Sequence, residues 1–434
     1  MNSITIYEFD ALAAHDSGLL DADGVHLVPA TVFRWLETQC WRITEQGDTA
    51  WLRLGQRRGR YVIKVTSFVG VIRTPDGMQI EVLPKVGKVI GGGIEEARKL
   101  LIQMLCCLQQ FRHVQTPSAM VSVAHMPLLE IFIQEFLREI QHVVKRGLRS
   151  DYISQEDNLA TMRGKLLVTS HLRRNLCRAD RFFTQHDEFS ANRPENRLLR
   201  LALERVLKMS VSGSNQRLAR ELHFVFTDIP ASAQPDMDFQ HIRLDRGMAY
   251  YARALAWTRL IIEDDSPLAG AGACNAPSLL FPMEALFEAY VAKHLARQLP
   301  PSLTLKLQAR SHHMMQHLGK KWFQLRPDLL VRNASTDIFV LDTKWKLLDA
   351  AKANGSDKYG LSQSDFYQLQ AYGQSYLDGS GDVVLIYPKT ENFTQPLPVF
   401  EFPKMKALRL WVLPFCLQSK RLLIPEHLQF DALR

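Results

Sequence analysis

A strongly apolar segment in the last third of the chain carries an acid and a base two positions apart. The segment runs Ile338-Phe339-Val340-Leu341-Asp342-Thr343-Lys344-Trp345-Lys346. Side chains alternate along a strand, so Asp342 and Lys344 are expected on the same face. An unpaired acid in such a strand costs free energy. The pattern therefore predicts either a structural ion pair between Asp342 and Lys344 or a site at which both residues react.

A second acid upstream, Asp328, favours a reactive site over a structural ion pair. Asp328 follows Arg326-Pro327, and a polar link, Arg332–Asp337, separates it from the apolar strand. If the link is a symmetric turn centred near Ser335, Asp328 and Asp342 lie opposite each other. Directly opposed side chains have Cβ atoms about 4.5–5.5 Å apart. Two carboxylates this close repel unless a cation lies between them, which predicts a shared metal ion.

The donor types indicate which ion and which reaction. Mg²⁺ prefers oxygen ligands and keeps several of its waters, and Mn²⁺ is an acceptable substitute. Such an ion can activate a bound water and stabilise charge on a phosphate. Lys344 beside it can position or deprotonate the water, or offset charge in the transition state. The constellation is therefore typical of metal-dependent hydrolysis of DNA phosphodiesters, with Asp328, Asp342 and Lys344 as catalytic residues.

A preceding amphipathic helix, expected over Phe281–Leu299, offers a further carboxylate. Glu288 lies on the flank of its apolar stripe and is predicted to bind the metal or a metal-bound water. Glu284, one turn earlier, is the rival for this role. A solvated helix flank is the alternative reading for Glu288.

The elements around these residues have a consistent order. Strands are expected over Leu303–Arg310, Trp322–Val331 and Ile338–Lys346, with Asp328 inside the second of them. A helix is expected over Gln363–Leu377 and a short buried strand over Val383–Tyr387. The order is helix, three strands, helix, strand, which predicts a mixed sheet flanked by helices.

The whole chain is expected to be an α+β protein with three regions. Residues 1–93 are expected to form a β-rich region, with a hairpin turn at Thr74-Pro75-Asp76-Gly77 and a short helix around Ala30–Thr38. Residues 94–270 are expected to form a helical connector that includes helices beginning at Pro127 and Pro194. Residues 271–434 are expected to form the nuclease domain, after a boundary rich in Gly, Ala and Pro at Ser266–Ser278.

The charge of the chain is compatible with a nucleic-acid partner. The 434 residues have a formal net charge of +8, and a basic run spans Lys145–Arg181. Lys165, Arg173 and Arg174 in this run are the predicted contacts to DNA phosphates. A solvated surface, or acidic contacts within a complex, is the alternative for the same run.

The sequence does not indicate a nucleotide-binding, membrane-spanning or secreted protein. The glycine-rich Gly87–Gly93 lacks the Gly-Lys-Ser/Thr ending of a phosphate-binding loop, so no nucleotide cofactor is expected. No segment has the roughly 18 apolar residues of a membrane helix, and the N-terminus lacks the features of a signal peptide. The six cysteines are scattered without metal-ligand spacing. A reduced, cytoplasmic protein is therefore expected.

At these residues the chain resembles the McrC family, the endonuclease subunit of McrBC-type restriction systems that depend on 5-methylcytosine and a member of the PD-(D/E)xK nuclease superfamily. The resemblance covers most of the chain. It is carried by the segments Ile80–Lys85, Leu159–Leu166, Asp187–Ser190, Asn196–Leu199, Leu286–Val291, Arg326–Asp328, Leu341–Lys346 and Asp365–Tyr372.

The resemblance implies a restriction-endonuclease-like C-terminal domain, a partner and additional site residues. Members of the family bind an AAA+ GTPase ring, McrB, through their N-terminal region and stimulate its GTP hydrolysis. The ring reads the modified cytosine and moves the DNA, and the McrC subunit cuts. In this chain the Thr343 carbonyl is expected to join the metal ligands, and Gln368 to orient water or phosphate. Two other functions stay open: a non-catalytic activator of the ring with a vestigial nuclease fold, and a stand-alone DNA repair nuclease.

Overall fold

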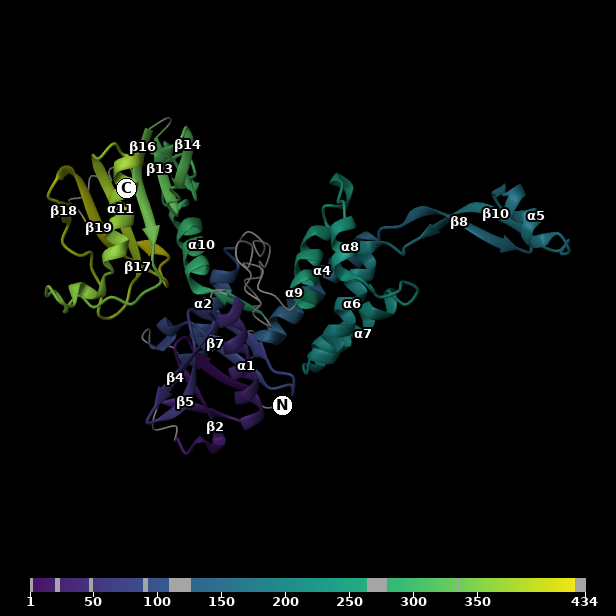
Figure 1. The fold of residues 1–434 in the computed structure, drawn as a ribbon, viewed down its shortest axis with the longest axis horizontal. Helices are drawn as coiled ribbons and strands as arrows, with labels where there is room; N and C mark the ends of the chain where they lie inside the picture. The colour runs from purple at the N-terminus through teal and green to yellow at the C-terminus, as the bar shows by residue number, and fades with distance from the viewer. Residues whose placement is uncertain are drawn as a thin grey trace. The chain divides into compact units, whose positions relative to one another are not determined.

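The computed structural model describes residues 3–19, 24–46, 50–88, 93–108, 126–263, 279–333 and 336–425 (Figure 1). By its internal contacts the chain forms two units. Unit 1 combines Met1–His125 with Asp265–Arg434, and unit 2 consists of Met126–Asp264. Unit 2 is therefore inserted into the sequence of unit 1. Within the described residues, no helix is long and apolar enough to cross a membrane.

The N-terminal part of unit 1 contains two four-stranded sheets. The first has the order β1-β7-β6-β11 and the second β3-β2-β5-β4. The predicted Thr74–Gly77 turn is confirmed, since β6 and β7 are antiparallel with Arg73 opposite Gln79. The strands are β1 (Ser3–Tyr7), β2 (Ala11–Ala14), β3 (Val25–Val28), β4 (Leu52–Arg57), β5 (Arg60–Val65), β6 (Phe68–Arg73), β7 (Gln79–Leu83) and β11 (Leu280–Pro282).

Helix α1 (Ala30–Gln46) is longer than the predicted Ala30–Thr38 because its apolar stripe continues. Leu36, Cys40 and Ile43 are all buried in the core that the helix shares with the sheets. Short 3-10 turns accompany these elements at η1 (His15–Ser17) and η3 (Lys85–Lys88).

The division into units differs from the predicted boundary after residue 93. Helix α2 (Gly93–Leu105) was expected to open the connector, but it packs against β7 and α10 (Met283–Leu295) of unit 1. Strand β11 belongs to the N-terminal sheet, where it pairs with β6. The predicted boundary segment Ser266–Ser278 and residues 89–92 of the glycine-rich stretch lie outside the described residues.

Unit 2 is a helical bundle with a β-arm. The helices that begin at Pro127 and Pro194 form as predicted, with Pro127 as the N-cap of the first and Pro194 in the first turn of the second. The helices are α4 (Leu128–Arg146), α6 (Pro194–Met209), α7 (Gly213–Val225), α8 (Pro235–His241) and α9 (Tyr251–Glu263), with a 3-10 turn η5 (Arg246–Met248).

The prediction that this connector is helical was wrong for its middle. Strands β8 (Asp151–Leu159) and β10 (Phe182–Ser190) pair antiparallel over nine residues. Strand β9 (Lys165–Leu166) and helix α5 (Val168–Asn175) complete the arm, seen within unit 2 in Figure 1. Strand β8 is half-buried or exposed throughout. It therefore lacks the apolar alternation by which a strand is recognised in sequence.

The C-terminal part of unit 1 is built on a mixed sheet, as predicted. Its strands β12-β15-β16-β17-β19-β18 are antiparallel from β12 to β16 and parallel from β16 to β19. The elements are β12 (Leu303–Leu307), β13 (His313–His317), β14 (Lys320–Gln324), β15 (Leu329–Asn333), β16 (Thr336–Thr343), η6 (Lys358–Gly360), α11 (Gln363–Tyr376), β17 (Gly381–Pro388), β18 (Phe400–Phe402), β19 (Met405–Cys416) and β20 (Arg421–Leu422).

Helices α10 and α11 cover opposite faces of this sheet. Tyr372 and Leu369 of α11 share a core cluster with Val412 of β19. The ring of Phe287 in α10 lies 6.3 Å from that of Phe415, three residues further along the same strand. Because side chains alternate, residues 412 and 415 project from opposite faces. The predicted flanking of the sheet by helices is therefore observed.

The predicted single strand Trp322–Val331 was wrong. Residues 320–324 pair with β13 in a separate two-stranded hairpin, and β15 begins only at Leu329. Arg326-Pro327-Asp328 lies between the two strands and not inside one. Proline cannot donate to a ladder hydrogen bond, which explains the break at Pro327.

Candidate active site

The two predicted aspartates lie side by side at the ends of β15 and β16. Leu329 pairs with Leu341 in the antiparallel ladder, and one further step places Asp328 opposite Asp342. The two aspartates are therefore opposite each other as predicted, but the hairpin is not symmetric, because its register shifts between Val331 and Arg332. Residues 334–335 of the turn lie outside the described part of the chain. The Asp328 carboxylate accepts hydrogen bonds from Thr343, from the backbone N at 2.8 Å and from Oγ1 at 2.8 Å. These bonds hold Asp328 against β16.

Asp342 is an almost fully buried acid whose nearest counter-charge is Lys344. Its exposed fraction is 1%, and the Lys344 Nζ lies 2.5 Å from its Oδ2. Burial, together with the negative charge of Asp328, raises the pKa of Asp342, against the opposing effect of Lys344. Burial is the largest single influence on Lys344 and lowers its pKa, but the charge and hydrogen bond of Asp342, together with the charges of Asp365 and Asp328, raise that pKa overall. The shared face predicted for Asp342 and Lys344 is confirmed.

Glu288 of α10 joins the cluster through its charge. Burial and the neighbouring Asp328 raise the pKa of Glu288 to about 7. Gln308, at the end of β12, donates from Nε2 to the Glu288 Oε1 at 2.9 Å, and the Arg326 guanidinium donates to the Gln308 Oε1. Glu284 is exposed, and its charge acts on Glu8 instead. Of the two rival acids, Glu288 is therefore the one at the cluster.

Helix α11 supplies a hydrogen-bonded chain behind Lys344. The Lys344 Nζ donates to the Gln368 Oε1 at 3.2 Å, and the Gln368 Nε2 donates to the Tyr372 hydroxyl at 2.8 Å. That hydroxyl donates to the Arg326 carbonyl at 3.0 Å. The chain fixes the position of the Lys344 ammonium relative to Asp342.

The donor set can be compared with the needs of a divalent ion. Among the described residues, no three His, Cys, Asp or Glu side chains form a ready metal cluster. Mg²⁺ is usually held by one or two carboxylates and otherwise by water, so the pair Asp328 and Asp342 meets its need. Burial raises the pKa of Asp342, and the negative charge of the neighbouring Asp328 raises it further. A hard cation would relieve this repulsion, so these residues fit the ion.

The predicted DNA contacts are in unit 2. Lys165 lies in β9 and Arg173 in α5, and both side chains are exposed. The Arg174 guanidinium lies 4.6 Å from the ring centre of Phe183, in a cation–π contact that supports the arm itself. Lys165 and Arg173 therefore remain the stronger candidates for contact with phosphates.

Three residues at the site, Gln308, Arg326 and Tyr372, had no role predicted from the sequence. Arg326 and Tyr372 lie in segments that carried the family resemblance, and this was their only signal. Gln308 had none, because it ends an ordinary alternating strand. Only the fold brings it within hydrogen-bonding distance of Glu288, twenty residues earlier in the chain.

A family model described as McrBC 5-methylcytosine restriction system component matches residues 63–388. A chain from a refined half-complex of the tetradecameric assembly of Thermococcus gammatolerans McrB AAA+ hexamers with bound McrC has a TM-score of 0.68 and 19% identity, and the match covers 96% of this chain and 95% of that one. This likeness shows a shared fold.

A chain from the cryo-EM structure of the Thermococcus gammatolerans McrBC complex has a TM-score of 0.48 and 18% identity, over 68% of this chain and 88% of that one. No curated protein gives a significant match.

Proposed function

This chain belongs to the family of McrBC 5-methylcytosine restriction system components, and from this membership and the acidic cluster we propose that it is the DNA endonuclease subunit of such a system. The reaction is hydrolysis of DNA phosphodiesters with Mg²⁺, on a restriction-endonuclease-like domain of the PD-(D/E)xK type. The observation that carries the proposal is the convergence of Asp328, Asp342 and Lys344 at the adjoining ends of β15 and β16.

The metal ligands in this proposal are the carboxylates of Asp328 and Asp342, with the Thr343 carbonyl and Glu288 completing the set directly or through water. A bound Mg²⁺ would lower the pKa of a water and stabilise charge on the phosphate. Mn²⁺ is a chemically suitable replacement because it favours the same oxygen ligands.

The remaining residues position groups and carry protons. Lys344 keeps its ammonium charge in the pocket, where it can bind the attacking water or the phosphate oxygen. Gln368 holds the Lys344 Nζ at 3.2 Å and presents its amide beside it. Glu288, with a pKa near 7, can accept or release a proton near neutral pH. Each residue thus serves a distinct part of the hydrolysis.

The partner in this proposal is an AAA+ GTPase ring. The similar solved structure is one of McrB AAA+ hexamers with bound McrC, and this chain has the same fold over nearly all of its length. We place the activity in the cytoplasm, where the ring and the DNA are accessible. The exposed Lys165 and Arg173 would contact phosphates of the DNA that the complex holds.

Cleavage and ring stimulation by an Asp342→Asn variant test the proposal. The purified chain and its ring partner are assayed for cutting of methylated plasmid DNA with Mg²⁺ and for GTP hydrolysis. We expect cutting to fall at least about 100-fold, while stimulation of GTP hydrolysis is retained. An exposed control, Asp378→Asn, should leave both unchanged.

The other functions give different results in the same assays. A non-catalytic activator of the ring would show no cutting by the native complex and no change in either assay for Asp342→Asn. A stand-alone repair nuclease would cut DNA without the ring or GTP. Either outcome would replace the proposed function.

A further inference from the structure

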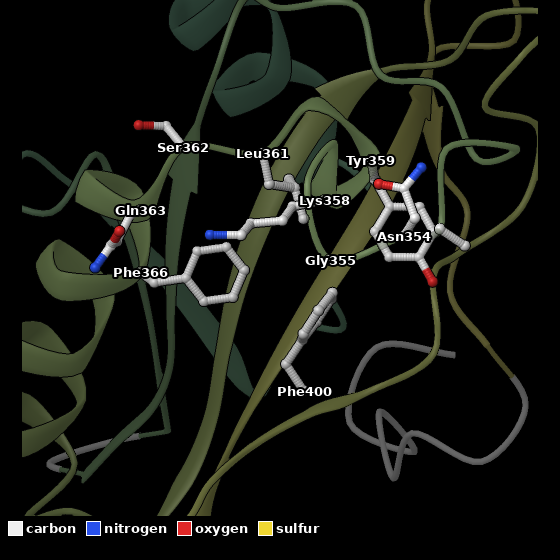
Figure 2. A pocket seen from close by; sticks show the side chains of 10 residues that line it. Asn354, Gly355, Lys358, Tyr359, Leu361, Ser362, Gln363, Phe366 and Phe400 are labelled. Carbon is white, nitrogen blue, oxygen red and sulfur yellow. The ribbon is translucent and has the colours of Figure 1, made fainter.

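A cavity of about 380 Å³ lies beside the first turns of α11 (Figure 2), and no residue of the acidic cluster lines it. Sites for small organic molecules have volumes of roughly 300–1,000 Å³. The walls come from the loop before α11, from α11 itself and from β18, and include Asn354, Lys358, Tyr359, Gln363, Phe366 and Phe400. The nuclease mechanism proposed above uses none of these residues.

Three aromatic rings, those of Tyr359, Phe366 and Phe400, line the cavity. The ring of Phe400 lies 5.3 Å from that of Phe366 at 78° and 6.4 Å from that of Tyr359 at 89°. All three side chains are only partly buried and pack against the core of the C-terminal sheet. Their remaining faces are available to a flat aromatic ligand, which can stack on one ring and meet the edges of the others.

A positive charge lies at the same opening. Lys358 is exposed, and within the described residues it makes no ion pair. In Figure 2 its stem lies beside the ring of Phe366. A flat aromatic group that also carries a negative charge complements this combination.

The loop is already held in this shape. The Tyr359 N donates to the Lys352 carbonyl at 2.9 Å, and the Lys358 N donates to the Asn354 carbonyl at 2.9 Å. Lys358 and Tyr359 have φ values of 48° and 58°, a left-handed conformation that costs free energy in residues with side chains. The hydrogen bonds offset this cost and preorganise the pocket.

The two amide side chains that line the cavity, Asn354 and Gln363, already have hydrogen-bond partners outside its lining. The Asn354 side chain binds the backbone N of Ser356 and of Asp357, and Gln363 donates to the Tyr367 hydroxyl. A ligand would therefore be held by stacking and charge rather than by hydrogen bonds to one particular base. Such binding tolerates every sequence.

The cavity and the acidic cluster are on opposite sides of one helix. Phe366 lines the cavity, and Gln368, two residues later, binds Lys344. Residues two positions apart on an α-helix project from nearly opposite faces, and a helix with its side chains is about 10 Å across. One DNA strand advances about 3.4 Å per nucleotide, so the width of the helix corresponds to about three nucleotide steps between the cavity and the acidic cluster.

We propose that this cavity takes one unstacked nucleotide of the DNA strand near the cleavage site, with its base among Phe366, Phe400 and Tyr359 and its phosphate at Lys358. A free nucleotide has the same chemistry, a heteroaromatic base with a phosphate. The DNA strand is preferred because the cavity shares α11 with the cluster that cuts. The inference rests on the proposed DNA substrate but does not depend on cleavage.

Binding of the full chain to single-stranded oligonucleotides in EDTA tests the inference without cutting. One fluorescein-labelled oligonucleotide is intact, and the other has abasic sites in its centre. We expect native protein to bind the intact strand about tenfold more tightly, and Phe400→Leu to bind both equally. The matched control Phe224→Leu, 79% exposed on α7, should discriminate as native protein does.

A second variant avoids any change in the core. Lys358→Gln should weaken binding to both strands and lower the slope of log affinity against log salt by about 0.7, whereas Lys352→Gln in the same loop should not. Native protein that binds both strands equally, or Phe400→Leu that still discriminates, overturns the inference. Thymidine monophosphate that binds as tightly as the oligonucleotide reassigns the cavity to free nucleotides and also overturns it.

The two proposals fail separately. If the native complex does not cut DNA but the intact strand is still preferred in EDTA, only the proposed nuclease function is lost. If the complex cuts and the abasic strand binds equally well, only the nucleotide pocket is lost.

Discussion

The indole Nε1 of Trp345 donates a hydrogen bond to the carboxylate of Glu8, at 3.0 Å from each oxygen. Glu8 directly follows strand β1, and Trp345 is the residue after Lys344. The Lys85 backbone N donates to the Glu8 Oε2 at 2.9 Å, and the Lys85 Nζ lies 5.6 Å from the Trp345 ring centre. The N-terminal sheet therefore holds the chain directly after the lysine of the candidate site.

The stability of the protein is expected to depend on pH through Glu8. Burial raises the pKa of Glu8 from 4.5 to about 7. A folded-state pKa above the unfolded value stabilises the fold at pH below 4.5, and this contribution is lost as the pH rises through about 7. Between pH 4.5 and pH 8 the free energy of unfolding should lose about 3 kcal/mol from this group. Denaturant titrations at several pH values measure the loss.

The variant Glu8→Gln removes the titrating group and should flatten this pH dependence. Glu96→Gln, which loses only the exposed ion pair with Lys99, should keep the native slope. An unchanged slope in Glu8→Gln would show that another group causes the dependence.

Asp342 and Lys344 should be strongly coupled in a double-mutant cycle. Lys344→Met leaves a carboxylate with 1% exposure without its counter-charge. The lysine side chain is 27% exposed, so we expect a loss of about 2 kcal/mol, below the usual range for a fully buried pair. The double variant with Asp342→Asn should recover most of this loss. Denaturant unfolding in EDTA measures all four proteins, and strictly additive effects would contradict the coupling.

Gln368 is expected to act as a positioning residue for Lys344. Gln368→Ala breaks the 3.2 Å bond to the Lys344 Nζ and should lower kcat about tenfold, with KM for DNA unchanged. Gln368→Glu keeps an acceptor at this position and should recover part of the rate. Gln370→Ala on the same helix is the control. A change in KM alone would indicate that Gln368 binds the DNA instead.

Gly70 should be essential to the pairing that joins the two sequence segments of unit 1. A Cβ at this position, where φ is +133°, would lie 1.9 Å from the Leu279 backbone O. Gly70→Ala is therefore expected to disrupt β6–β11 pairing and to lower the free energy of unfolding by about 2 kcal/mol. The melting temperature should fall by several degrees as a result. Gly55→Ala, whose Cβ would meet only Val62 at 3.7 Å, should change it little. Equal melting temperatures would show that the pairing contributes no stability.

Local patterns determined the elements around the candidate site. The alternation in Ile338–Lys346 put Asp342 and Lys344 on one face. The polar link Arg332–Asp337 put Asp328 opposite Asp342, which agrees with the ladder pairing of Leu329 with Leu341, although the register shifts nearer the turn. Both depend only on near neighbours in the chain, so they are readable without a fold. The β-arm of unit 2 was not readable, because β8 lacks an apolar face.

Contacts between distant residues were decided by tertiary structure alone. The choice of Glu288 over Glu284, the support of Glu288 by Gln308, and the anchoring of Trp345 by Glu8 each join residues from different elements. Their sequence separations range from 20 to 337, and no periodicity encodes which side chains meet over such distances. The chemistry of the site was thus present in the sequence, whereas its electrostatics arose only when burial brought the acids together.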